Sequence, residues 1–168
     1  MNPESFQTYS FGAHREGSVI VRVLAAAINA GDPYSVVLRH LRREGDLLWV
    51  GEQKYDLAVI RRVLVVGAGK AGYPMARAVT ELLGERISSG VVIVKDGYFP
   101  ADARLPRIEL CEASHPLPDE RGIGATRRIA NMLGNLSSQD LVLCLLSGGG
   151  SALLTAPAES ISHRIFRL

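Results

Sequence analysis

The feature that most constrains the fold is a series of four short apolar runs that are nearly continuous instead of alternating with polar residues. The runs are Val63 to Val66, Val91 to Val94, Ile108 to Cys111 and Leu141 to Leu146. A strand that is buried on both faces has this pattern, because neither of its faces carries polar side chains. The runs therefore predict the inner strands of a sheet that is covered by helices on both sides.

Two segments between these runs have the spacing and end signals of helices. Ala71 to Leu83 is followed by Gly84, and Asp119 to Leu133 is followed by Gly134. Glycine commonly ends a helix because it accepts left-handed backbone angles. Alternating strands and helices form βαβ units, and these units build a parallel sheet. We therefore predict an α/β fold, a Rossmann-like three-layer domain with a mainly parallel sheet.

Two further helices are predicted before the first run. Apolar residues recur at helical spacing from His14 to Ala30. The second helix begins with Asp32 as its cap and Pro33 at its first position, and Gly45 is its expected stop. Its buried stripe is predicted to be Val36, Val37 and Leu41. After it, Leu47 to Val50 is expected to be a short edge strand.

The connections in this prediction are mostly short. Gly51 to Asp56 is expected to be the turn after the short edge strand. The longest loop is predicted at Asp96 to Pro106, which contains two prolines. This spacing leaves the 168 residues as about one domain of ordinary size.

Charge and hydropathy exclude several classes of function. Nineteen Lys and Arg stand against seventeen Asp and Glu, a formal net charge of +2. This near-balance gives no bulk reason to bind nucleic acid or an anionic membrane. The apolar stretch from Val19 to Ile28 is interrupted by Arg22, so we expect neither a signal peptide nor a membrane span.

The two cysteines, Cys111 and Cys144, lie in apolar runs without the spacing of a zinc site. We expect both to be buried free thiols. A protein of this kind fits a reducing cytoplasm.

Polar or glycine-rich segments follow all four predicted strands. They are Gly67 to Lys70, Lys95 to Gly97, Ser114 to Pro116 and Ser147 to Ser151. In open parallel sheets, ligands bind beyond the carboxyl ends of the strands. The sequence therefore predicts one binding rim at that edge of the sheet.

The segment Gly67-Ala68-Gly69-Lys70-Ala71-Gly72 matches G-x-G-x-x-G and stands between a strand and a helix. Glycines let the backbone approach a phosphate, and the start of a helix offers free N–H groups. Asp96, at the end of the next strand, lies near the expected place of an acid that binds ribose hydroxyls. Taken alone, this pattern indicates a nicotinamide cofactor.

Lys70 argues for a different ligand. It is one of only three lysines, and a dinucleotide loop needs only backbone amides at that place. A lysine there suits a transferring phosphoryl group or a carboxylate. The alternative is a solvated residue of the first helical turn, although cations are disfavoured at a helix start. The loop is not a Walker A motif, because Ala71 follows the lysine instead of Ser or Thr.

The segment from Ser147 to Ser151 is predicted to be an anion-binding turn between a buried strand and a helix. A flexible linker is the alternative, and a serine hydrolase is disfavoured because no G-x-S-x-G frame surrounds Ser151. His115 lies in a loop with prolines on its C-terminal side. It could bind a substrate oxygen, serve in proton transfer or simply fasten its own loop, and the sequence leaves these roles open.

Three segments together carry a resemblance to a known family. They are Val65 to Ala71, Glu112 to Asp119 and Leu146 to Leu153. In this order and spacing they resemble the glycerate 2-kinase (MOFRL) family, from about Ser10 to Ile161. Three motifs together are far more specific than the glycine fingerprint alone.

The resemblance implies transfer of the γ-phosphoryl group of ATP to the 2-hydroxyl of D-glycerate, giving 2-phosphoglycerate, with Mg²⁺ as the metal. The site would lie in a cleft between an N-terminal Rossmann-like domain and a C-terminal domain. By motif, Lys70 would be the catalytic lysine and would also bind substrate together with His115. The nucleotide would be bound by Gly67, Gly69, Ser147, Gly148, Gly149, Gly150 and Ser151. The resemblance assigns no metal ligand to this chain.

Residues 1–168 look like the first of those two domains. Members of the family are longer, and His163 to Leu168 does not resemble their continuation. We expect a truncated chain that lacks the C-terminal MOFRL-type domain and has little or no kinase activity alone. The alternative activity is NAD(P)-dependent reduction of hydroxypyruvate or a similar 2-oxo acid, which would leave Lys70 without a role. Association into a homo-oligomer stays open.

Overall fold

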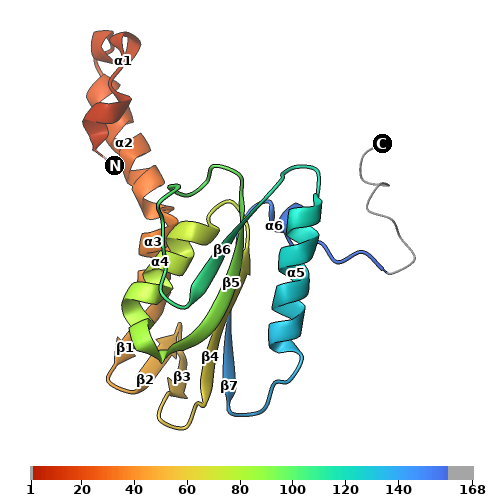
Figure 1. Cartoon of the computed structure of the whole chain (residues 1–168). Helices are drawn as coiled ribbons and strands as arrows, with labels where there is room; N and C mark the ends of the chain where they lie inside the picture. Colours follow the sequence, from red (N-terminus) through yellow and green to blue (C-terminus); the bar gives the residue numbers. More distant parts are fainter. Residues whose placement is uncertain (1, 159–168) are drawn as a thin grey trace.

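The four apolar runs form a parallel sheet in the computed structural model, which describes residues 2–158 (Figure 1). The strands are β4 (Arg62–Ala68), β5 (Ile87–Lys95), β6 (Ile108–Ala113) and β7 (Asp140–Leu146). They lie side by side in the order β6-β5-β4-β7, and every neighbouring pair is parallel. This confirms the predicted α/β fold with a mainly parallel sheet.

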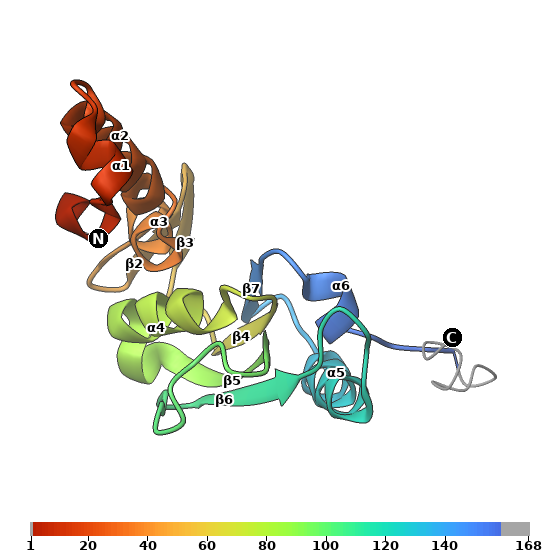
Figure 2. The same ribbon diagram turned by 90° about the horizontal axis from the view of Figure 1, so that it is seen from above.

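Helices cover the sheet on both faces and give three layers (Figure 2). Helix α4 (Gly72–Leu83) packs on one face, where it meets Val63 and Val65 of β4. Helix α5 (Glu120–Leu133) packs on the other face, where it meets Val66. Successive strand residues point to opposite faces, so a continuous apolar run can fill both layers. Both predicted helices are confirmed within one residue.

The order of the strands creates one point at which the chain changes direction. From β4 the chain moves outward through β5 to β6, and it then crosses to the other side of β4 to form β7. The segments that follow β4 and β7 therefore continue to opposite faces of the sheet. Ligand sites of open parallel sheets lie at such a switch point. Here the pairing of Ala68 with Leu146 brings the two following loops together.

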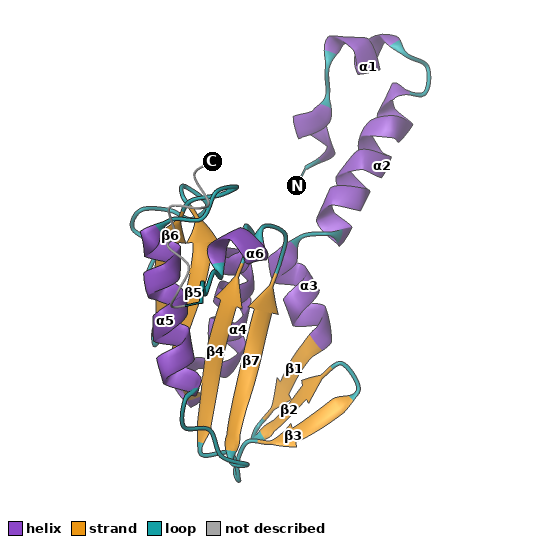
Figure 3. Ribbon diagram, turned by 90° about the vertical axis from the view of Figure 1, so that its right-hand side faces the viewer, coloured by secondary structure: helices purple, strands orange, loops and turns teal. Residues whose placement is uncertain are grey.

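The N-terminal prediction was wrong for residues 41–44 and 53–56, although the predicted strand Leu47–Val50 is confirmed. Helix α3 (Pro33–His40) lies beside α4 and is followed by a small antiparallel sheet, β1-β2-β3, beside the main one (Figure 3). Its strands are β1 (Leu41–Glu44), β2 (Leu47–Val50) and β3 (Gln53–Asp56).

Four expectations change with this small sheet. The turn predicted from Gly51 to Asp56 is shorter, because Gln53–Asp56 form strand β3. The second helix does not run to Gly45, because that glycine turns the chain from β1 into β2 at φ +59°. Leu41 is buried, but in a strand. The run from Leu47 to Val50 is the central strand and not an edge. Cross-strand pairing and the complete burial of Leu48 outweigh the local helical pattern here.

Residues 2–30 form a helical arm that extends away from the sheet (Figures 1 and 3). It consists of the 3-10 helix η1 (Pro3–Phe6), α1 (Tyr9–Ala13) and α2 (Gly17–Ala30). The buried residues of α2 are Gly17, Val21 and Ala25, on the side where η1 and α1 lie. The rest of its apolar residues are exposed.

One of the two cysteines is not where the sequence predicted. Cys111 is buried as expected, but Cys144 is exposed. Cys144 lies on β7, the edge strand, and points to the face that no described helix covers at this position. Within residues 2–158 no helix is long and apolar enough to cross a membrane.

Candidate functional site

The loops after β4 and β7 are joined into one structure. The amide of Lys70 donates to the Gly148 carbonyl at 3.0 Å, and the amide of Ser147 donates to the Ala68 carbonyl at 3.1 Å. The hydroxyl of Ser147 accepts a hydrogen bond from the amide of Ala71 at 3.0 Å. Two segments that are about 75 residues apart in the sequence thus form a single site at the switch point.

The glycines of the G-x-G-x-x-G segment permit this close approach. A Cβ on Gly67 would lie 2.6 Å from the Leu145 carbonyl oxygen. A Cβ on Gly69 would lie only 2.1 Å from Ser147 Oγ, and the φ of +140° at Gly69 disfavours any side chain. These two glycines therefore allow the loops after β4 and β7 to pack directly against each other.

The amides of this segment are also engaged inside the protein. Those of Gly69 and Gly72 donate to the carbonyls of Ile93 and Gly69, each at 3.1 Å, and those of Lys70 and Ala71 donate to the neighbouring loop. In this conformation no amide of residues 69–72 is free to bind a pyrophosphate. That arrangement differs from what the dinucleotide fingerprint requires.

The loop after β7 is the more open of the two. Within residues 2–158 the amides of Gly148 and Gly149 have no hydrogen-bond partner. Gly148 is exposed, and a Cβ there would meet no atom within 4 Å. Gly149 has a φ of +90°, which favours glycine. These two neighbouring amides can donate to an anion without breaking any bond of the fold.

The side chains of Lys70 and His115 converge on Gly149. A Cβ at Gly149 would lie 2.9 Å from His115 Nε2 and 3.5 Å from Lys70 Cε. Lys70 is exposed and His115 is half-buried. Within the described residues Lys70 forms no salt bridge, so its charge is available to a ligand. The structure thus brings together the predicted lysine, the predicted histidine and the glycine turn.

The remaining predicted residues lie close to this centre. The amide of Gly150 donates to the Ser147 carbonyl at 3.2 Å and begins the short helix α6 (Gly150–Leu153). Ser151 is exposed on α6. The half-buried hydroxyl of Ser147 faces the β4 loop, where it accepts from the Ala71 amide.

Sequence reasoning missed Arg121, which closes the other side of the rim. Its guanidinium donates to both oxygens of Asp96, each at 2.7 Å, and to the Asp119 carboxylate at 2.7 Å. Asp96 is therefore already paired with a cation and does not stand free for a ribose. One sequence signal could have pointed to Arg121. It lies in the first turn of a helix, where a cation is disfavoured unless an acidic side chain pairs with it.

Charge at this part of the rim is fixed by these contacts. Burial alone would raise the pKa of Asp119, but bonds from the Gly122 amide and from Arg121 outweigh it and lower that pKa. The carboxylates of Asp96 and Asp119 raise the pKa of Arg121. Asp119 and Arg121 therefore stay charged, and the helix α5 that follows is capped by the Asp119 carboxylate, which accepts from the Gly122 amide at 3.0 Å.

A metal site is not formed by the described residues. No group of three or more His, Cys, Asp or Glu side chains in residues 2–158 could hold a metal ion. The acids at the rim, Asp96 and Asp119, both pair with Arg121.

Comparison with known proteins gives a consistent result. The family described as "Domain of unknown function (DUF4147)" matches residues 19–166. A glycerate 2-kinase of Pyrococcus horikoshii is 37% identical over 148 residues, which are 88% of this chain and 32% of that protein. A putative hydroxypyruvate reductase of Agrobacterium vitis is 39% identical over 147 residues, covering 86% of this chain and 29% of that protein.

A solved structure supports the same likeness. A crystal structure of a protein from Pyrococcus horikoshii OT3 superposes with a TM-score of 0.78 and 35% sequence identity. The match covers 90% of this chain and 33% of that one. This chain therefore spans about a third of the length of the relatives that it matches.

Proposed function

The chain belongs to the DUF4147 family, and from this premise we propose that it forms the anion-binding part of a glycerate 2-kinase site. The observation that carries the proposal is the convergence of Lys70 and His115 on Gly149, beside two amides that have no hydrogen-bond partner among residues 2–158. The ligands would be the phosphate groups of ATP and the D-glycerate that receives the γ-phosphoryl group. Similarity to proteins named for this activity supports the assignment.

The residues present suit phosphoryl transfer in a specific way. The reaction requires positioning of the groups and stabilisation of negative charge on the transferring phosphoryl group. Lys70 would supply a mobile cation, and the amides of Gly148 and Gly149 would donate to phosphoryl oxygens. His115 would donate a hydrogen bond to a substrate oxygen from the same side. No step is assigned to Mg²⁺, because the described residues contain no group of three or more His, Cys, Asp or Glu side chains that could hold a metal ion.

The reductase alternative is less well supported. A nicotinamide dinucleotide needs free amides in the G-x-G-x-x-G loop, and those of residues 69–72 donate within the protein. It also needs an unpaired acid for the ribose, and Asp96 is held by Arg121. Lys70 would have no role in hydride transfer. A reductase is therefore kept as one outcome of the test.

The test is the thermal stability of the purified chain with Mg·ATP, with D-glycerate and with NADH. A ligand at a hundred times its dissociation constant stabilises a fold by ~2.7 kcal/mol. The variant is Lys70→Met, which keeps the length of the side chain and removes its charge. Lys54→Met is the matched control, because Lys54 lies on β3 in the small antiparallel sheet.

We expect Mg·ATP or D-glycerate to stabilise the wild type and Lys54→Met, and to have a much smaller effect on Lys70→Met. Stabilisation by NADH alone would contradict the kinase proposal and support the reductase. An equal effect of Mg·ATP on both variants would remove Lys70 from the site. If no ligand stabilises the chain, this part of the family fold does not bind the anions by itself.

A further inference from the structure

The side chain of His115 reaches a loop that begins far from its own. His115 follows β6 and Gly149 follows β7, and these strands are the two edges of the main sheet. Neighbouring strands lie ~4.8 Å apart, so the two loops begin ~14 Å from each other. Nevertheless, a Cβ on Gly149 would lie 2.9 Å from His115 Nε2. Contacts within the protein therefore direct the His115 loop, residues 114–119, toward the loop after β7.

The loop after β7 covers part of this distance. It leads into α6, which packs beside the start of α5 (Figures 1 and 2). A Cβ on Gly122 of α5 would lie 2.9 Å from the Leu153 carbonyl oxygen of α6, so glycine permits this approach. The rest of the distance depends on how the His115 loop is held between β6 and α5.

Asp119 closes the His115 loop at its C-terminal end. Its carboxylate caps α5 by accepting from the Gly122 amide at 3.0 Å. Burial raises the pKa of this carboxyl, but hydrogen bonds outweigh burial and lower it, and one of them comes from the amide of Ser114. Ser114 is the first residue of the loop. A single carboxylate therefore contacts both the start of the loop and the helix that follows it.

Arg121 connects Asp119 to the neighbouring strand. Its Nε donates to the Asp119 carboxylate at 2.7 Å, and its two terminal nitrogens donate to the two oxygens of Asp96, each at 2.7 Å. The Asp96 amide donates to the Ala113 carbonyl at 3.1 Å, and Ala113 is the last residue before the His115 loop. The Asp96–Arg121–Asp119 network thus forms a closed ring of contacts at the base of the loop.

The geometry of this network suits orientation more than stability. The side chains of Arg121 and Asp96 are exposed to 53% and 46%. Ion pairs as exposed as this one contribute little to the free energy of unfolding. A guanidinium that binds a carboxylate through two parallel hydrogen bonds fixes its direction, which a lysine cannot do. The network therefore restricts where the His115 loop lies.

We propose that Asp119 and Arg121 are positioning residues, which hold the His115 loop so that the imidazole stays against Gly149 and beside Lys70. They act on a ligand only through His115. The identity of that ligand rests on the proposed function, whereas the position of the imidazole can be measured without a ligand. The alternative is that Asp119 serves only as the cap of α5.

The first experiment measures the position of the imidazole by NMR in the ligand-free chain. A Cβ on Gly149 would lie 2.8 Å from His115 Cδ2, so a nuclear Overhauser effect between these two residues is expected. The chain has four histidines, and His115→Ala assigns the signal. We expect the effect to be lost in Arg121→Met and in Asp119→Ser. Serine keeps a cap for the Gly122 amide but is too short to pair with the guanidinium as well.

Asp32→Ala is the matched control. Asp32 is also an aspartate that caps a helix, because its carboxylate accepts from the Ser35 amide at 2.9 Å at the start of α3. Asp32→Ala should lower the melting temperature and leave the Overhauser effect unchanged. Asp119→Ser should do the reverse, with a melting temperature near that of the wild type and no Overhauser effect.

The second experiment measures the dissociation constant of D-glycerate at a temperature at which every variant is folded. We expect Arg121→Met to raise it about tenfold, which is the contribution of one hydrogen bond to a charged group. His115→Ala should raise it by as much. The double variant should be no weaker than His115→Ala, because both changes remove the same contact. Asp32→Ala should bind like the wild type.

Two results would overturn the proposal. They are an Overhauser effect that persists in Arg121→Met and Asp119→Ser, and losses of affinity that add in the double variant. The proposed function fails separately. If the wild type does not bind D-glycerate while the same two substitutions still abolish the Overhauser effect, the proposed function is contradicted and the positioning role stands.

Discussion

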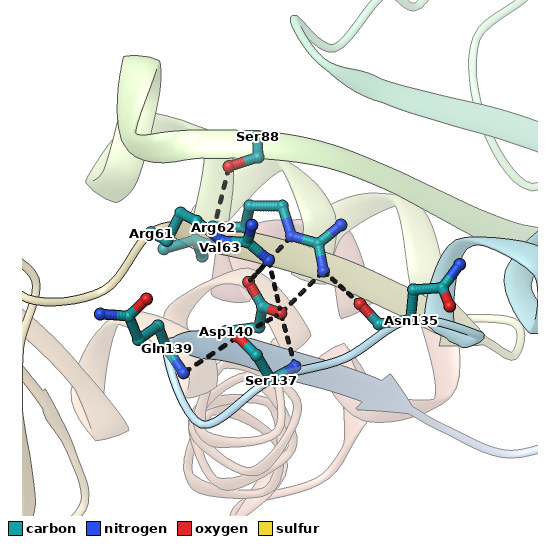
Figure 4. Close-up of polar contacts among 8 residues, drawn as sticks. All are labelled: Arg61, Arg62, Val63, Ser88, Asn135, Ser137, Gln139 and Asp140. Atoms are coloured by element: carbon teal, nitrogen blue, oxygen red, sulfur yellow. Dashed lines mark hydrogen bonds and ion pairs between the residues drawn. The ribbon is translucent and has the colours of Figure 1, made fainter.

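Arg62 and Asp140 form a bidentate pair that joins the first residues of β4 and β7. Arg62 donates from Nε to one oxygen of Asp140 at 2.8 Å and from its terminal nitrogen to the other at 2.7 Å (Figure 4). The Asp140 side chain is fully buried, and it also accepts from the amide of Ser137 at 2.8 Å. The pair fixes the register of the two strands whose opposite ends carry Lys70 and Ser147.

Replacement of this acid should weaken the fold. The hydrogen bond from Arg62 is the largest cause that holds the pKa of Asp140 well below its ordinary value, and hydrogen bonds from Ser137 lower it further. Asp140→Asn removes the acceptor charge and leaves Arg62 without its partner, so we expect a clear drop in melting temperature. Circular dichroism or a dye-based melt measures it.

The same pair predicts the pH dependence of stability. Folding lowers the pKa of Asp140. The contribution of its carboxylate to the free energy of unfolding is therefore complete above the pKa of the unfolded state, about 3.9, and is lost as the pH falls below that value. The difference in melting temperature between wild type and Asp140→Asn should therefore be constant near neutral pH and should narrow below about pH 4. A difference that stays constant in acid would contradict this assignment.

Two alanine substitutions in the rim should behave differently. At Gly69 a Cβ would overlap Ser147 Oγ at 2.1 Å, and the backbone is left-handed. We expect Gly69→Ala to destabilise the protein by ~1–3 kcal/mol or more in urea unfolding. At Gly148 a Cβ meets open space, so Gly148→Ala should change stability little. If both substitutions reduce stability equally, the contact with Ser147 is not the reason why position 69 requires glycine.

The hydroxyl of Ser147 is expected to act through the fold. Ser147→Ala removes the acceptor of the Ala71 amide, and a lost hydrogen bond of this kind costs ~1 kcal/mol. We also expect the loop that carries Lys70 to loosen, so that stabilisation by Mg·ATP decreases. Ser151→Ala is the control, because Ser151 is exposed and its side chain makes no described hydrogen bond. A larger effect of Ser151→Ala on stability would refute this division of roles.

The two cysteines should react at very different rates. Cys144 is exposed, whereas burial raises the pKa of the Cys111 thiol and keeps it protonated. The native chain should therefore react quickly with one equivalent of a thiol reagent and should release the second thiol only on unfolding. Cys144→Ser should remove the fast phase, and a fast phase that persists in this variant would place Cys111 in solvent.

The sequence determined the central sheet, its two main covering helices and the position of the rim. These features rest on local signals: continuous apolar runs, helical spacing, the caps at Asp119 and Gly84, and the glycines that follow the strands. Such signals act over a few residues, so they can be read without knowing what packs against them.

Only the tertiary structure decided the rest. It joined Ser147 to the Gly69 loop and Arg121 to Asp96. It also placed strands β1 and β3 on either side of the predicted strand Leu47–Val50, where the sequence indicated a helix end and a turn. It also left Cys144 and most apolar residues of α2 exposed. In each case the outcome depends on which distant segment lies nearby, because burial and pairing free energy come from contacts between elements and not from either element alone.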